Sequence, residues 1–193
     1  GAAALLCEYQ TENYEALSLK LEQAAVVLQR LPLLHPARFS TVEKERLFYW
    51  KLRKGLFPSV GAVRKRGTTV ILEDVAFPVA RLADAVVDLQ LLFQEFGYEN
   101  AIIFGHAKDG NIHFVITQWL DTPAEVQRYN AFMQKVVKLV VEKYDGALKA
   151  EHGTGRNMAP FIATEWGEDA YAMMQEIKII AVSTKTVTWF STE

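Results

Sequence analysis

The stretch Ala101-Ile-Ile-Phe-Gly-His-Ala-Lys-Asp-Gly-Asn-Ile-His-Phe-Val-Ile116 decides the fold of this chain. Its two ends, 101–104 and 112–116, are apolar runs rich in β-branched and aromatic residues, which favour strands. The Asp109-Gly110 pair between them is typical of a tight turn. The sequence therefore predicts a β-hairpin with a polar, glycine-containing connection.

The elements outside this hairpin follow from apolar periodicity and from the prolines and glycines that interrupt it. In chain order we expect a strand at 3–9, a helix at 12–31, a helix from 41 past 53 that stops near 58, a basic loop at 61–67, a strand at 68–72, a helix at 78–96 capped by Gly97, the two hairpin strands, a helix at 123–144 capped by Thr122, and a helix at 164–180. This order predicts an α+β fold, a ferredoxin-like antiparallel sheet covered by helices on one face.

The composition narrows the class of protein. The chain has 193 residues and a formal net charge of −2. This length suits one domain or two small lobes. The charge gives no strongly basic field that would favour nucleic acid, and no apolar run reaches the roughly 18 residues of a transmembrane helix. The single cysteine, Cys7, is expected to be a small buried residue, and its lack of a disulfide partner predicts a cytoplasmic protein.

Three of the four histidines lie in two short segments that contain glycine. His106 and His113 flank the hairpin turn, where side chains can face one side of the sheet and converge on one ion. Glu151 and His152 lie in a glycine-rich loop that leaves Glu151 free to complete a metal site and His152 free to act as a general base. Zinc suits this ligand set, and manganese or cobalt would accept it. The other interpretation is a turn with incidental histidines.

Three segments together resemble the C-terminal domain of FAD-linked oxidases. They are Phe104-Gly-His-Ala-Lys-Asp-Gly-Asn-Ile-His113, Glu73-Asp-Val-Ala-Phe-Pro78 and Lys149-Ala-Glu-His-Gly-Thr-Gly155. The family includes D-lactate dehydrogenases, glycolate oxidase and D-2-hydroxyglutarate dehydrogenase, and the resemblance covers about Trp50 to Lys178. The continuation Thr154-Gly-Arg-Asn-Met-Ala-Pro160 looks most like the large bacterial members in which a flavin dehydrogenase, similar to D-2-hydroxyglutarate dehydrogenases, is fused to an iron–sulfur region.

The resemblance implies a role for each of these groups. It implies metal ligation by His106, His113 and Glu151, and it makes His152 the base that takes the hydroxyl proton of a small 2-hydroxyacid. The hydride would leave for an FAD held mainly by an FAD-binding domain absent from this chain. Substrate contacts are expected from Arg53, Asn111 and Arg156.

The resemblance also sets the expected domain bounds. Residues 1–181 would be the substrate and metal domain, a fragment of a larger flavoprotein, and 182–193 an atypical or truncated tail that lacks the usual closing segment of the family. Any iron–sulfur cluster would lie elsewhere in the parent protein, because such clusters need about four thiolates. Leu72 stands where relatives often carry a substrate-binding lysine, and Val115 where some carry asparagine, so substrate contacts are expected to differ.

Two other functions stay open at this point. One is a stand-alone metal-dependent hydrolase that uses the same ligands and a metal-bound water. The other is a non-catalytic ferredoxin-like module that assembles through a sheet edge or its helices. A homodimer and peripheral attachment to the inner membrane through the parent protein are open as well.

Overall fold

The computed structural model describes residues 3–153 and 155–183. Contacts divide the chain into two compact units, Gly1–Ser59 and the residues from Val60 onward, and each unit is described by itself. Among the described residues, none of the helices combines the length and the apolar character that crossing a bilayer requires.

The first unit is helical. α1 (Tyr14–Leu28) begins where the side chain of Asn13 accepts a hydrogen bond from the backbone N–H of Ala16, which is a regular N-cap. α2 (Glu43–Lys54) follows, and α3 (Leu56–Val63) begins directly after it.

Three predictions for this part of the chain are wrong. Residues 3–9 form no strand, and Cys7 is exposed rather than buried. Pro58 does not stop the helical region, because it lies in the first turn of α3, where a proline removes no hydrogen bond of the helix. The basic loop therefore begins only after Val63.

The second unit is built on a three-stranded antiparallel sheet with the order β1-β3-β2. Its strands are β1 (Thr69–Ala76), β2 (Ile102–His106) and β3 (Asn111–Gln118). β2 and β3 are the predicted hairpin, and β1 extends four residues beyond the predicted end at Leu72. The α+β class is confirmed.

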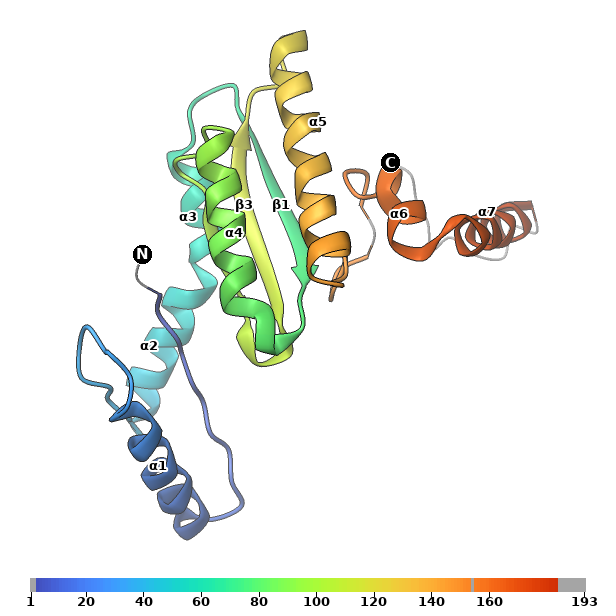
Figure 1. The fold of residues 1–193 in the computed structure, drawn as a ribbon. Coiled ribbons are helices and arrows are strands. Elements are labelled where there is room, and N and C mark those ends of the chain that lie inside the picture. The colour runs from blue at the N-terminus through green and yellow to red at the C-terminus, as the bar shows by residue number, and fades with distance from the viewer. Residues whose placement is uncertain (1–2, 154, 184–193) are drawn as a thin grey trace. The chain divides into compact units, whose positions relative to one another are not determined.

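Two helices cover one face of the sheet (Figure 1). α4 (Leu82–Glu95) follows the short helix η1 (Val79–Arg81), and α5 (Pro123–Val137) continues into the π-helical segment η3 (Lys138–Lys143). The core forms where their apolar faces meet alternate residues of β1 and β3, and its largest members include Leu89, Phe93, Phe114, Ile116 and Phe132. The predicted helix caps Gly97 and Thr122 are both present.

The order of elements is that of a ferredoxin-like unit. β1-α4-β2-β3-α5 matches the first five elements of that fold, in which a fourth strand would then pair with the free edge of β1. In the described part of the chain, a single antiparallel bridge between Ala76 and Ala147 takes that position. The bridge brings the segment after Gly146 beside the end of β1.

The chain after this segment is helical again. η4 (Ala159–Phe161), α6 (Ile162–Trp166) and α7 (Glu168–Ser183) replace the single helix expected at 164–180. The break lies at Gly167, whose φ of +83° belongs to the left-handed region that favours glycine. Most of the predicted tail, from 184 onward, lies outside the described residues.

Candidate metal centre

The predicted metal ligands gather on the face of the sheet that α4 and α5 leave uncovered. Side chains alternate between the faces of a strand, so Ile112 and Phe114 of β3 enter the core while Asn111 and His113 face the other way. His113 pairs in register with Asp74 of β1 on one side and with Phe104 of β2 on the other. His106 lies two residues beyond Phe104 and therefore on the same face.

The hairpin turn sets the separation of the two histidines. The connection is a short 3₁₀ turn, η2 (Ala107–Asp109), closed by Gly110 at a φ of +69°. A Cβ on Gly110 would lie 2.0 Å from the carbonyl oxygen of Phe77, so the position requires glycine for both conformation and space. The backbone of Gly110 in turn accepts a hydrogen bond from Phe77 N–H at 2.9 Å. The turn is thus fixed against the end of β1.

Glu151 reaches both histidines from a different part of the chain. Its Oε1 lies 2.9 Å from Nε2 of His113 and 3.4 Å from Nε2 of His106. One ligand atom of each residue lies within 4.8 Å of the other two, which makes this the group in the described residues that could hold a metal ion. The structure therefore brings together the three residues that the sequence predicts as ligands.

His152 lies beside this group. Its ring stacks on that of His113 with centroids 5.1 Å apart and an interplanar angle of 22°. Its Nε2 is 3.7 Å from Oε1 of Glu151, and about half of its side chain is exposed. It therefore borders both the three-residue group and the solvent.

The residue that holds this loop in place, Asp74, is not among those predicted from the sequence. Asp74 is fully buried, and its Oδ2 accepts hydrogen bonds from the backbone N–H groups of Ala150, Glu151 and His152 at 2.8–3.1 Å. Its Oδ1 accepts a hydrogen bond from the Asn111 side chain at 2.6 Å. The available signal was an acidic pair, 73–74, inside an otherwise apolar strand, because a buried carboxylate needs partners.

The other acidic residue of that pair, Glu73, holds the same loop from the opposite face of the sheet. Glu73 is 1% exposed and accepts hydrogen bonds from Lys149 Nζ at 3.1 Å and from Asn157 Nδ2 at 2.8 Å. Neighbouring residues of a strand point to opposite faces, so Glu73 and Asp74 fix the loop at different points. Together they bind residues 149–152 and Asn157 to β1.

The electrostatics of the group favour neutral imidazole at the buried ligand. Burial lowers the pKa of His113, and the nearby His152 and His106 act in the same direction, against the carboxylates of Asp74 and Glu151. Burial alone would raise the pKa of Asp74, but the hydrogen bonds that it accepts outweigh this and lower it. At neutral pH both shifts act in one direction, favouring a charged Asp74 and a neutral His113, the form that can bind a metal.

The three residues predicted to contact the substrate lie in different settings. Asn111 is buried, its Nδ2 is committed to Asp74 and to the carbonyl of Val75, and its Oδ1 has no hydrogen-bond partner in the described residues. Arg156 is exposed on the loop after His152. Arg53 lies in α2 of the first unit.

The donor set fits a divalent ion. Zinc binds nitrogen and oxygen ligands at about 2.0–2.1 Å, which places neighbouring ligand atoms of a tetrahedral site roughly 3.3 Å apart. The separations from Oε1 of Glu151 to Nε2 of His113 and of His106, 2.9 and 3.4 Å, lie close to that value, and all three ligand atoms lie within 4.8 Å of one another. His106 and Glu151 are each about half exposed, so solvent and small molecules can reach this group.

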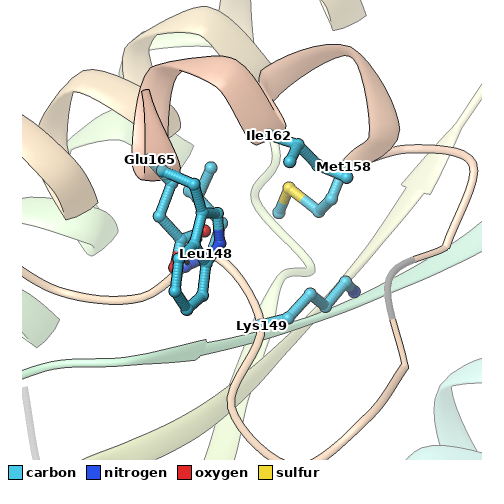
Figure 2. A pocket seen from close by; sticks show the side chains of 6 residues that line it. Leu148, Lys149, Met158, Ile162 and Glu165 are labelled. Atoms are coloured by element: carbon cyan, nitrogen blue, oxygen red, sulfur yellow. Dashed lines mark hydrogen bonds between the residues drawn. The ribbon is translucent and has the colours of Figure 1, made fainter. Parts of the chain in front are cut away.

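A separate hollow of about 190 Å³ lies near the C-terminal helices (Figure 2). It is lined by Leu148, Lys149, Met158, Ile162, Glu165 and Trp166. Burial raises the pKa of Glu165, whose carboxylate also accepts a hydrogen bond from the backbone N–H of Leu148. None of the three predicted ligands lines this hollow, so it is not the metal group.

Comparison with known proteins gives one consistent result. The family described as FAD linked oxidases, C-terminal domain, matches residues 1–180. The chain is 28% identical over 151 residues to a mitochondrial D-lactate dehydrogenase [cytochrome] of Kluyveromyces lactis, which covers 73% of this chain and 24% of that protein. It is 28% identical over 141 residues to glycolate oxidase subunit GlcD of Escherichia coli K12, with 73% and 27% covered. The chain thus spans about a quarter of the length of these curated relatives.

Proposed function

Because this chain belongs to the family of FAD-linked oxidase C-terminal domains, we propose that it is the substrate- and metal-binding part of an FAD-dependent D-2-hydroxyacid dehydrogenase. The observation that carries the proposal is the meeting of His106, His113 and Glu151, with the ring of His152 stacked on one of them. The names of the relatives support a hydroxyacid substrate of the lactate or glycolate kind. D-lactate and D-2-hydroxyglutarate are the substrates that we propose to test.

The chemistry follows from the positions of the groups. A divalent ion held by the two histidines and Glu151 would lower the pKa of the substrate's α-hydroxyl group. His152 would take the hydroxyl proton on a ring nitrogen, and FAD would supply the acceptor for the hydride that leaves the α-carbon. The products would be a 2-oxoacid and reduced flavin, so protons and electrons would balance. We propose zinc as the ion, since two imidazoles and a carboxylate suit it.

The remaining roles are proposals of the same kind. Arg53 would hold the substrate carboxylate as a bidentate clamp, and Arg156 and Asn111 would add polar contacts. FAD would bind mainly to a separate domain of the parent protein, a larger flavoprotein that we place among the members with an iron–sulfur region. A cytoplasmic location stays a prediction.

The experiment that tests the metal site is a titration of the 193-residue chain with Zn²⁺, followed by calorimetry. We expect one site in the unaltered chain and its loss in the variants His106→Ala, His113→Ala and Glu151→Gln, because each removes a ligand. The matched control is His35→Ala, which removes the one histidine outside both segments. Equal binding by all of these chains would contradict the proposal.

The experiment that tests the base follows turnover in the longer flavoprotein, with a D-2-hydroxyacid and a dye as electron acceptor. His152→Gln should lower kcat by about 10²- to 10⁴-fold, the usual contribution of a general base, and leave Zn²⁺ affinity nearly unchanged. Full turnover in this variant would exclude His152 as the base. Metal-dependent hydrolysis of esters by the chain alone would favour the hydrolase instead.

A further inference from the structure

The two carboxylate oxygens of Asp74 make different contacts. Oδ2 accepts hydrogen bonds from three consecutive backbone N–H groups, those of residues 150–152. Oδ1 accepts the Asn111 amide and lies 3.4 Å from Nδ1 of His113. One fully buried side chain thus contacts the backbone that carries Glu151 and the ring of a second predicted ligand.

The contact with His113 constrains which nitrogen of that ring is free. Nδ1 of His113 is buried and makes no hydrogen bond in the described residues, and the carboxylate oxygen that it faces is Oδ1 of Asp74, 3.4 Å away. A carboxylate only accepts hydrogen bonds, so the favourable arrangement places the ring's proton on Nδ1, facing Asp74. In a neutral imidazole the lone pair then lies on Nε2, the atom that faces Glu151.

We propose that Asp74 is the positioning residue of this metal centre: it fixes the backbone that carries Glu151 and orients His113 so that Nε2 is the metal-binding atom. The proposal rests on the metal site proposed above. Carboxylates that accept the second N–H of a metal-bound histidine are common, and their loss typically lowers metal affinity by about 10- to 100-fold. Nothing in this role requires Asp74 to touch the substrate.

The neighbouring Glu73 supplies the control. It is equally buried, belongs to the same strand, and holds the same loop through Lys149 and Asn157, but its side chain lies on the other face of the sheet. No described contact joins Glu73 to His106, His113 or Glu151. A loss of loop stability alone should therefore appear in Glu73→Gln as well as in a variant of Asp74.

The variant Asp74→Asn separates the two parts of the role. The carbonyl oxygen of the new side chain can still accept hydrogen bonds from the three backbone N–H groups. Its NH₂ group can be accommodated if the Asn111 amide turns so that the unpaired Oδ1 of Asn111 faces this NH₂. That NH₂ then faces Nδ1 of His113 as a donor, so the ring is driven to carry its proton on Nε2. The loop stays in place while the metal-binding atom is blocked.

The first measurement is nitrogen-15 NMR of the histidine rings in the Zn²⁺-loaded chain. In the unaltered chain we expect His113 to bind through Nε2 and to show a slowly exchanging proton on Nδ1. Zn²⁺ affinity should fall about 10- to 100-fold in Asp74→Asn and change less than threefold in Glu73→Gln. Binding of His113 through Nδ1, or equal losses in the two variants, would overturn the proposal.

The second measurement needs no metal, and it separates failure of this inference from failure of the proposed function. Hydrogen exchange of the metal-free chain should show protected amides at residues 150–152 and a loss of that protection, by at least about tenfold, in Asp74→Ala. Protection that survives in Asp74→Ala would refute the anchoring role. If these amides behave as expected but no Zn²⁺ binds, the metal site is wrong while the anchoring of the loop stands.

Discussion

At the scale of single residues, two glycines of the second unit, one after α4 and one in the hairpin turn, meet different requirements. Gly97 and Gly110 both adopt positive φ, +72° and +69°. A Cβ on Gly97 would meet nothing within 4 Å, whereas one on Gly110 would meet the backbone of Phe77. Only the second glycine is therefore also required by close packing, and its turn is the one that separates the two predicted histidine ligands.

We expect Gly110→Ala to lower the free energy of unfolding by more than Gly97→Ala. The left-handed conformation alone costs a residue with a Cβ about 1–2 kcal/mol, and this cost is common to both variants. The clash with Phe77 adds to it only at Gly110, where backbone must shift. Urea denaturation of both variants gives the comparison, and equal losses would show that the turn relaxes without cost.

At the scale of elements, the packing of α4 and α5 on the sheet supports the site from the opposite face. Phe114 of β3 contacts Phe93 of α4 and Phe132 of α5, with ring centroids 5.6 and 6.0 Å apart. Phe114 is the residue that follows His113. The core helices therefore fix the strand that carries the buried histidine.

The variant Leu89→Ala tests this support. Leu89 is 1% exposed in α4, and truncation of a buried leucine costs about 2–5 kcal/mol through lost burial and the cavity left behind. Leu91 of the same helix is 55% exposed, so Leu91→Ala is the matched control and should change stability by less than about 0.5 kcal/mol. Similar effects of the two changes on urea denaturation would mean that α4 is not packed as described.

At the scale of the whole molecule, stability should depend on pH through carboxylates with opposite shifts. Hydrogen bonds from Lys143 and Tyr144 lower the pKa of Asp88, and the hydrogen bonds described above lower that of Asp74. Such groups stabilise the fold fully above their unfolded pKa of about 3.9, and this contribution is lost as the pH falls through the lowered value. Glu165 acts in the opposite sense, because burial raises its pKa.

We therefore expect the free energy of unfolding to fall as the pH is lowered from about 5 to below 4. Asp88→Asn should make this fall shallower, because it removes one group with a lowered pKa. Glu165→Gln should make it steeper, because the protonation of Glu165 partly offsets the loss on the way down. Urea denaturation at several pH values gives the free energy of unfolding of the unaltered chain and of the two variants. A free energy that does not change over this pH range would contradict the lowered pKa values of Asp74 and Asp88.

The sequence by itself determined what depends on local pattern. The apolar runs on either side of Asp109-Gly110 predicted the hairpin, and the positions of His106 and His113 on either side of its turn predicted a shared face. Apolar periodicity also predicted the helices that form α4 and α5. These features follow from a few neighbouring residues and the geometry of one strand or helix.

Only the tertiary structure decided which distant segments meet. Asp74 binds backbone N–H groups more than seventy positions away, and no periodicity links the two segments. Residues 3–9 form no strand, because a strand forms only where another strand pairs with it. The helix expected at 164–180 is interrupted at Gly167, whose φ lies in the left-handed region. A local pattern fixes the face on which a side chain lies, whereas burial of a charged group such as Asp74 becomes favourable only when the folded chain brings its hydrogen-bond donors to it.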